Sequence, residues 1–186
     1  MLPNIYFVGK AGAGKSYSAE FLKQTYGYKT AKFAYPIYDI ARNYFEMKNK
    51  DRKLLQIIGT DAGRIMINEN IWINRLVEDL KIVRETEKYL QRSHTYYVSD
   101  DVRFKNEHIA LKSAGWVGIY LDVPDDVRIQ RLKNRDGTAQ EATLQHVSEL
   151  EIDTFKDELI KIDATQLLEN MYKDITNLLN KLKYEG

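Results

Sequence analysis

The sequence contains no cysteine among its 186 residues, which excludes disulfide bonds, thiolate metal sites and cysteine nucleophiles. It contains only three prolines, and no proline-rich or glycine-rich linker divides it. It also lacks an excess of charge of one sign, because 28 Lys and Arg residues oppose 27 Asp and Glu residues. A net charge of +1 creates no global basic field, so we expect no nucleic-acid partner.

Long apolar runs are absent as well. None approaches the roughly 18 residues that cross a membrane, and no signal peptide precedes the first motif. We therefore expect a cytoplasmic protein with no membrane partner. Apolar residues make up 44% of the chain and charged residues 30%, a composition that supports one globular domain with a sizeable core.

The most specific motif is the spacing G-x-x-x-x-G-K-S, which runs from Gly9 to Ser16. The β-prone run Ile5–Val8 precedes it, and a helical pattern follows it. Glycines let backbone N–H groups surround a polyphosphate, and the helix adds the positive end of its dipole. We expect Lys15 to reach the β- and γ-phosphates and the Ser16 hydroxyl to ligate Mg²⁺. The motif predicts a nucleoside triphosphate site. Its candidate residues are Gly9, Ala11, Gly12, Ala13, Gly14, Lys15, Ser16 and Tyr17.

Five β-prone runs alternate with helical patterns along the chain. This alternation predicts an α/β fold, a five-stranded parallel sheet flanked by helices, with right-handed crossovers. The predicted strands are Ile5–Val8, Thr30–Phe33, Tyr96–Ser99, Val117–Leu121 and Leu159–Ile162. The predicted helices are Lys15–Tyr26, Ile37–Met47, Arg52–Asn68, Trp72–Gln91, Lys105–Ala114, Asp125–Asn134 and Gln166–Lys183.

Two insertions extend this core within the single domain 1–186. Residues 36–92 are almost entirely helical and too long for one crossover, so they are a candidate acceptor-binding arm. Residues 135–150 are polar, which is typical of a short lid that keeps water from the phosphates. The core then comprises about residues 1–35, 93–134 and 151–186.

Two carboxylates follow the predicted strand Tyr96–Ser99. Ligands of an open parallel sheet bind beyond the carboxyl ends of its strands, so Asp100 and Asp101 are expected to face the nucleotide. We favour Asp101 as the second Mg²⁺ ligand, because it begins the run Asp-Val-Arg-Phe-Lys-Asn-Glu. Asp100 is equally consistent with a helix cap or a solvated turn. Arg103 is a candidate for contact with the transferring phosphate.

A second dense patch, Gly59-Thr60-Asp61-Ala62-Gly63-Arg64, lies in the helical insertion. Small residues that interrupt an amphipathic helix indicate a ligand close to the backbone. Arg64 suits a bidentate grip on a monophosphate, and Asp61 suits a sugar hydroxyl or a base amino group. Trp72 is either a stacking face for a base or a core residue. Arg42 is either a further phosphate clamp or part of a solvated helix face.

Three arginines share one face of a predicted helix, at Arg128, Arg131 and Arg135. Like charges on one face repel each other unless an anion or acidic neighbours compensate them. The acidic neighbours are Asp125, Asp126 and Asp136. We favour phosphate contact for Arg131 and Arg135, because a lid must carry positive charge to neutralise a phosphoryl-transfer transition state.

These features together resemble the deoxynucleoside monophosphate kinases of bacteriophages, from about residue 4 to 165. The motifs that carry the resemblance are the phosphate loop, Gly59-Thr60-Asp61…Arg64…Trp72, Asp101-Val102-Arg103-Phe104-Lys105-Asn106-Glu107 and His146-x-Ser148-Glu149. The resemblance implies a three-layer P-loop kinase fold with a monophosphate-binding arm and a lid. It implies transfer of the γ-phosphoryl group of ATP to a deoxynucleoside monophosphate with Mg²⁺, in the host cell cytoplasm if the protein is viral. It assigns no role to His146, Ser148 or Glu149.

A monophosphate acceptor is already anionic at pH 7, so the predicted mechanism needs no general base and rests on positioning and charge neutralisation. The catalytic candidates are Lys15, Arg103, Arg131 and Arg135. The candidates for substrate binding are Arg42, Asp61, Arg64, Trp72, Asp101 and Arg103. The metal candidates are Ser16 and Asp101.

Two other functions remain open from the sequence. One keeps the fold and changes the acceptor, to phosphomevalonate or dephospho-coenzyme A. The other is a nucleotide switch, although the Asn-Lys-x-Asp signature of GTP-reading switches is missing.

The sequence also leaves open which bases are accepted and whether deoxyribose is preferred. A homodimer is open as well, because Trp72–Gln91 can pack internally or against a second subunit. His94 and His108 are expected at the surface.

Overall fold

The computed structural model describes residues 1–136 and 150–185, and the side chains of residues 136, 184 and 185 are not part of that description. The described chain forms two compact units. Unit 1 comprises Met1–Thr30 and Thr95–Gly186, and unit 2 comprises Ala31–His94. The predicted lid at 135–150 lies almost entirely outside the described residues, as do His146, Ser148 and Glu149.

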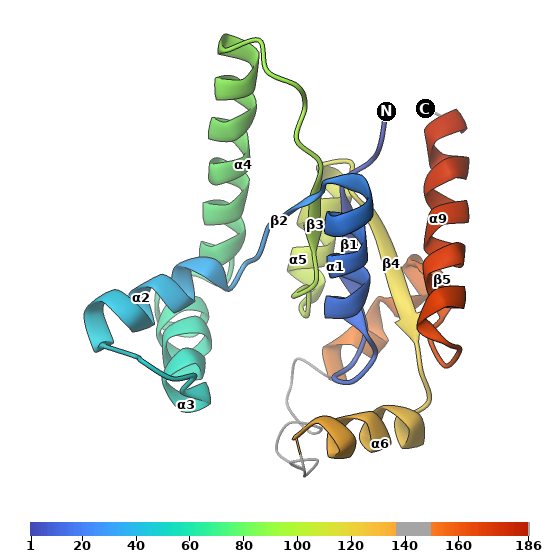
Figure 1. The fold of residues 1–186 in the computed structure, drawn as a ribbon. Coiled ribbons are helices and arrows are strands. Elements are labelled where there is room, and N and C mark those ends of the chain that lie inside the picture. Colours follow the sequence, from blue (N-terminus) through green and yellow to red (C-terminus); the bar gives the residue numbers. More distant parts are fainter. Residues whose placement is uncertain (137–149, 186) are drawn as a thin grey trace. The chain divides into compact units, whose positions relative to one another are not determined.

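Unit 1 is built on a five-stranded sheet in the order β2-β3-β1-β4-β5, with every neighbouring pair parallel (Figure 1). The strands are β1 (Ile5–Val8), β2 (Lys29–Thr30), β3 (Tyr97–Ser99), β4 (Val117–Asp122) and β5 (Ile160–Asp163). All four residues of the central strand β1 are buried, as its run of apolar residues requires. The predicted α/β fold with a parallel sheet is confirmed.

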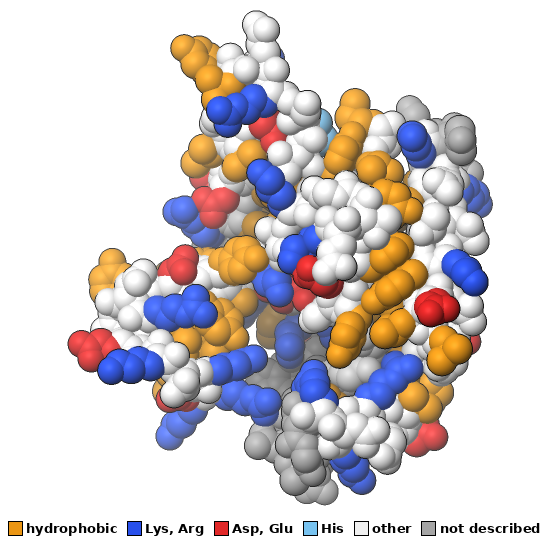
Figure 2. Space-filling view, in the orientation of Figure 1, with side chains coloured by type: hydrophobic (Ala, Val, Ile, Leu, Met, Phe, Trp, Pro, Cys, Tyr) orange, Lys and Arg blue, Asp and Glu red, His pale blue; other side chains and the backbone are white. Residues whose placement is uncertain are grey.

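Helices cover both faces of this sheet. Successive side chains of β1 point to opposite faces, and all of them are buried, so each face needs a covering layer. Ile5 and Phe7 belong to the hydrophobic core that includes α1 and α9, whereas Tyr6 contacts His108 of α5. Figure 2 shows hydrophobic side chains along the α1 and α9 side of unit 1, where the rings of Phe21 and Tyr172 stack with centroids 4.2 Å apart. The helical segments of unit 1 are α1 (Lys15–Tyr26), α5 (Lys105–Ser113), α6 (Asp125–Asp136), η2 (Ile152–Thr154), η3 (Lys156–Glu158) and α9 (Leu168–Glu185).

Unit 2 is entirely helical in its regular structure, as predicted for the arm. Its elements are α2 (Tyr35–Phe45), α3 (Arg52–Gln56), the π-helix η1 (Ile57–Ile67) and α4 (Ile71–Tyr89). The Asp51 carboxylate caps α3 by accepting a hydrogen bond from the Leu54 N–H at 3.0 Å. The sequence predicted a single helix over Arg52–Asn68. The structure instead has a short α-helix followed by eleven residues of π-helix.

The edge strand β2 is shorter than predicted and begins earlier. It pairs only with β3, through Lys29 and Thr30, and the chain passes into unit 2 at Ala31. Ala31 and Phe33 are buried without belonging to the sheet, which explains why their apolar character imitates a strand. Within the described residues, no helix combines the length and apolarity needed to span a membrane.

Candidate active site

The phosphate loop joins β1 to α1, as its motif predicts. Gly12 and Gly14 adopt φ values of +87° and +101°, which L-residues with a Cβ rarely adopt. A Cβ on Gly12 would lie 2.6 Å from the backbone oxygen of Arg128, so α6 packs directly against the loop. The Ala13 N–H donates to the Lys10 carbonyl at 3.1 Å and closes the turn. The loop is thus fixed by its own backbone and by α6.

Lys15 is half-buried, and its ammonium lies over the loop. The Nζ atom donates to the carbonyl of Gly9 and, at 3.2 Å, to the carbonyl of Lys10. This places the positive charge at the N-terminus of α1, where the helix dipole also favours an anion. The geometry fits the predicted contact between Lys15 and a polyphosphate. Tyr17 of α1, which was also predicted to contact the nucleotide, is 60% exposed.

Asp100, and not Asp101, lies beside the predicted metal-binding hydroxyl. The Ser16 Oγ donates to Asp100 Oδ2 at 2.8 Å, and Asp100 is only 7% exposed. β3 neighbours β1 in the sheet, so the residue that follows β3 meets the start of α1. Asp101 accepts a hydrogen bond from Ser99 Oγ at 2.9 Å. A hydroxyl and a carboxylate oxygen are donors that Mg²⁺ prefers, so Ser16 and Asp100 fit this ion.

Glu107 gives the run Asp101–Glu107 an architectural role. Its side chain is 2% exposed, and Oε2 accepts hydrogen bonds from the N–H groups of Arg103 at 2.7 Å and Phe104 at 3.0 Å. These bonds satisfy donors at the N-terminus of α5 and fix the backbone of Arg103, whose side chain is exposed. An acidic residue three positions into a predicted helix is the signal that identifies this cap from sequence.

The three arginines on one face of α6 differ in burial and in their hydrogen-bond partners. Arg128 is 4% exposed, and its Nε donates to Asp125 Oδ1 at 2.6 Å, while its Nη1 is buried with no hydrogen-bond partner among the described residues. The hydrogen bond from Arg128 lowers the pKa of Asp125. Arg131 donates from Nη2 to the Ala164 carbonyl at 2.7 Å, after the end of β5. Arg135 is exposed. Arg128 therefore packs against the phosphate loop, and the phosphate contacts favoured from the sequence for Arg131 and Arg135 stay predictions.

Trp72 is a core residue of unit 2, so of the two roles that the sequence left open its burial supports packing and contradicts a stacking face for a base. The indole is 5% exposed and donates from Nε1 to the Gly59 carbonyl at 2.8 Å. A Cβ on Gly63 would lie 2.5 Å from the indole ring, and one on Gly59 would lie 2.9 Å from the Ile37 side chain. Glycine is therefore needed at these two positions of η1 because side chains of unit 2 fill the space beside them. This packing explains the small residues without a ligand close to the backbone.

The polar candidates of unit 2 are accessible. Arg42 is exposed on α2, with its guanidinium 5.4 Å from the centroid of the Tyr38 ring. Arg64 is half-buried and donates to the Glu69 carbonyl at 3.2 Å, and Asp61 is exposed. These three side chains remain candidates for contact with an acceptor.

His108 is buried, so its expected surface position is wrong. The ring is fully buried, with Nδ1 2.8 Å from Tyr6 Oη and Nε2 3.3 Å from Glu158 Oε2. It also stacks on Phe155 with centroids 5.0 Å apart. Burial raises the pKa of Tyr6 above its usual range. No local sequence pattern predicts these contacts, because Tyr6 of β1 and Glu158 of η3 both lie far from His108 along the chain.

No protein-family model and no curated protein matches this chain. Many solved structures are similar to it, and two of them match over nearly their whole lengths. A gluconokinase from Sinorhizobium meliloti 1021 has 16% identity and a TM-score of 0.59, with 99% of this chain and 97% of that chain covered. A shikimate kinase from Acinetobacter baumannii, solved with shikimate, has 19% identity and a TM-score of 0.60, with 98% and 96% covered. With its parallel sheet and phosphate loop, the chain therefore has the α/β fold of the P-loop kinases.

Proposed function

We propose that this chain is an ATP-dependent kinase that phosphorylates a deoxynucleoside monophosphate to the diphosphate, with ADP as the second product. The observation that carries the proposal is the pairing of Ser16 with Asp100 beside a loop that holds the ammonium of Lys15. The acceptor rests on the resemblance of the Gly-Thr-Asp patch and the Asp-Val-Arg-Phe-Lys-Asn-Glu run to the phage kinases.

The loop residues bind and orient the triphosphate in this mechanism. Lys15 supplies a positive charge that follows the transferring phosphoryl group, and Gly12 and Gly14 provide the left-handed backbone of the loop. Ser16 and Asp100 would hold Mg²⁺, which when bound neutralises charge on the β- and γ-phosphates. This assignment replaces the Asp101 favoured from sequence.

Arginines complete the charge neutralisation on the acceptor side. We assign Arg42 and Arg64 of unit 2 to the acceptor phosphate, Asp61 to its sugar or base, and Arg103 to the transferring group. Arg131 and Arg135 remain proposed contacts from α6, with Arg131 already bonded to Ala164. No side chain has to remove a proton, because the attacking phosphate oxygen is anionic at pH 7.

A second candidate is a kinase whose acceptor is a small molecule with a hydroxyl group. Two observations favour it: Trp72 is buried, so it cannot stack on a base, and the two similar structures are named for gluconate and shikimate chemistry. A hydroxyl acceptor needs a proton acceptor, and the half-buried Asp101 would supply the carboxylate.

The test is ADP release from ATP and Mg²⁺ with a panel of acceptors. The panel contains the four deoxynucleoside monophosphates, the four ribonucleotides, phosphomevalonate, dephospho-coenzyme A, shikimate and gluconate. The proposal predicts stimulation by at least one deoxynucleotide and none by shikimate or gluconate, with Lys15→Ala as the inactive control. Stimulation by a hydroxyl acceptor alone would establish the second candidate, and no stimulation by any acceptor would contradict both.

A further inference from the structure

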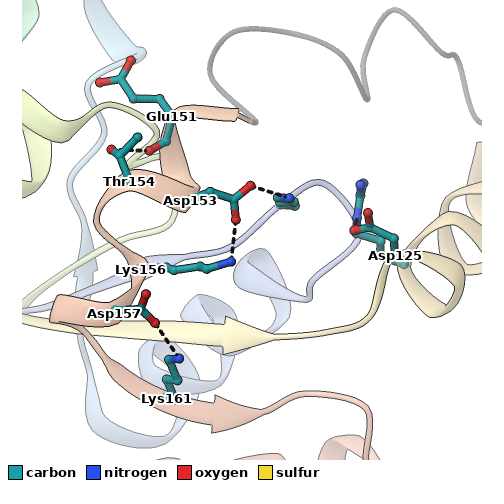
Figure 3. A network of polar contacts seen from close by, with 9 residues as sticks. Asp125, Glu151, Asp153, Thr154, Lys156, Asp157 and Lys161 are labelled. Carbon is teal, nitrogen blue, oxygen red and sulfur yellow. Dashed lines mark hydrogen bonds and ion pairs between the residues drawn. The ribbon is translucent and has the colours of Figure 1, made fainter.

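The first residue inside the phosphate loop, Lys10, carries a second ammonium that is directed to a distant acidic side chain. Lys10 Nζ lies 2.8 Å from Asp153 Oδ2, in η2. The other oxygen of the same carboxylate, Oδ1, accepts a hydrogen bond from Lys156 Nζ at 2.7 Å (Figure 3). One carboxylate of η2 therefore joins the phosphate loop to the start of η3.

The backbone of Lys10 holds the loop together. Its carbonyl accepts from the Ala13 N–H at 3.1 Å and from Lys15 Nζ at 3.2 Å. A movement of Lys10 would displace both the loop turn and the oxygen on which the Lys15 ammonium rests. Lys10 is thus held at both ends, by its carbonyl inside the loop and by its side chain on Asp153.

The surroundings strengthen this contact. The Lys10 side chain is 20% exposed and that of Asp153 is 38% exposed, so water screens the pair only in part. Burial by itself would raise the pKa of Asp153, but the hydrogen bonds from Lys10 and Lys156 hold that pKa below its usual range. The carboxylate is therefore ionised at neutral pH and able to hold both ammonium groups.

We infer that Asp153 is a positioning residue for phosphoryl transfer, which fixes the phosphate loop through Lys10 and keeps the Lys10 ammonium away from the phosphates. Asp153 acts on the backbone that carries Lys15, and it does not itself touch the reacting atoms. The inference rests on the proposed function only in that the loop binds the phosphates of ATP.

The first test measures amide hydrogen exchange by NMR in the full chain without nucleotide, so it does not depend on any activity. Asp153→Asn and Lys10→Met should each reduce the protection of the Ala13 N–H by about three- to fivefold, the effect expected of one partly exposed ion pair. The double variant should show no further loss, and Lys10→Arg should retain protection because its guanidinium still pairs with Asp153.

Asp157→Asn is the matched control. Asp157 forms a similar ion pair with Lys161 at 2.7 Å in the same region, but at 75% exposure and without a bond to the loop. This variant should leave Ala13 protection unchanged within about 1.5-fold. Unchanged protection in Asp153→Asn, or an equal loss in Asp157→Asn, would overturn the inference.

Turnover supplies the second readout. With whichever acceptor the wild type uses, Asp153→Asn should lower kcat about fivefold while KM for the acceptor stays within about twofold, because the defect lies in the placement of Lys15. An equal fall for Asp157→Asn would indicate loss of folded protein and contradict the positioning role. If the wild type turns over no acceptor but the exchange pattern holds, the proposed function fails and the structural coupling stands.

Discussion

The phosphate loop and the π-helix η1 both contain closely spaced glycines, but the glycines have different causes. In the loop, Gly12 and Gly14 have positive φ values, and no described atom lies within 4 Å of the position that a Cβ on Gly14 would take. In η1, neither Gly59 nor Gly63 has a positive φ, and side chains of Ile37 and Trp72 occupy the space where their Cβ atoms would be. The backbone conformation requires glycine at both loop positions, and at Gly12 the close contact with the Arg128 backbone oxygen requires it as well. At Gly59 and Gly63 the crowding by neighbouring atoms is the requirement, with no positive φ.

This difference separates glycines that a left-handed backbone conformation requires from glycines that packing alone requires. Both segments look alike in the sequence, since each combines small residues with a nearby cation. Only the loop is followed by a helix N-terminus with a charged side chain over it, which is where an anion is stabilised. If this separation is correct, substitutions at the loop should lower activity, and substitutions around η1 should lower the stability of unit 2.

The largest effect is expected for Lys15→Ala, which removes the charge over the loop. We expect kcat to fall by three orders of magnitude or more, about 4 kcal/mol of barrier, with the fold intact by circular dichroism. Steady-state ADP release measures this. Turnover within about tenfold of the wild type would remove Lys15 from the mechanism.

A smaller effect on activity distinguishes the two aspartates after β3. Asp100→Asn should lower kcat by about 100-fold and raise the Mg²⁺ concentration needed for half-maximal rate, because it weakens the pair with Ser16. Asp101→Asn is the matched control and should cost less than about tenfold when the acceptor is a phosphate. The reverse order of the two effects would restore Asp101 as the metal ligand.

Gly63→Ala should destabilise unit 2 without changing the phosphate loop. The added methyl group would lie 2.5 Å from the Trp72 ring and 2.8 Å from the Ile58 carbonyl, so we expect a loss of about 2–3 kcal/mol in the free energy of unfolding. Urea unfolding gives this value, and fluorescence titration gives the affinity for ATP, which should stay within about twofold. A weakened affinity at unchanged stability would place Gly63 near the nucleotide.

The smallest effect is expected for Trp72→Phe. It removes the hydrogen bond from Nε1 to the Gly59 carbonyl and part of a buried ring, which together cost about 1–2 kcal/mol of stability. KM for the acceptor should stay within about twofold, because the indole is buried. A tenfold rise in KM with stability preserved would show that the indole binds the acceptor after all.

The elements that local patterns determine were predictable from the sequence. β1 at Ile5–Val8 and α1 at Lys15–Tyr26 have the predicted bounds, because an apolar run, a glycine motif and helical spacing lie next to each other in the chain. The five strands and their parallel direction follow from the same alternation of patterns, whereas the order of the strands in the sheet was not predicted.

Features that depend on partners distant in the chain were not predictable. The burial of His108 depends on Tyr6 and Glu158, and the choice of Asp100 over Asp101 depends on how β3 meets α1. The π-helical geometry of η1 accompanies the packing of Ile37 and Trp72 against its glycines. Each of these outcomes is decided by side chains that come together only in the folded chain.

The sheet order has a consequence for how the chain emerges from the ribosome. β1, the first strand to be made, lies between β3 and β4, which begin at Tyr97 and Val117. All of unit 2 is synthesised before either neighbour of β1 exists. A nascent chain that stops after residue 94 thus carries an apolar strand with no partner to pair with, a state in which chaperone binding and aggregation compete with folding.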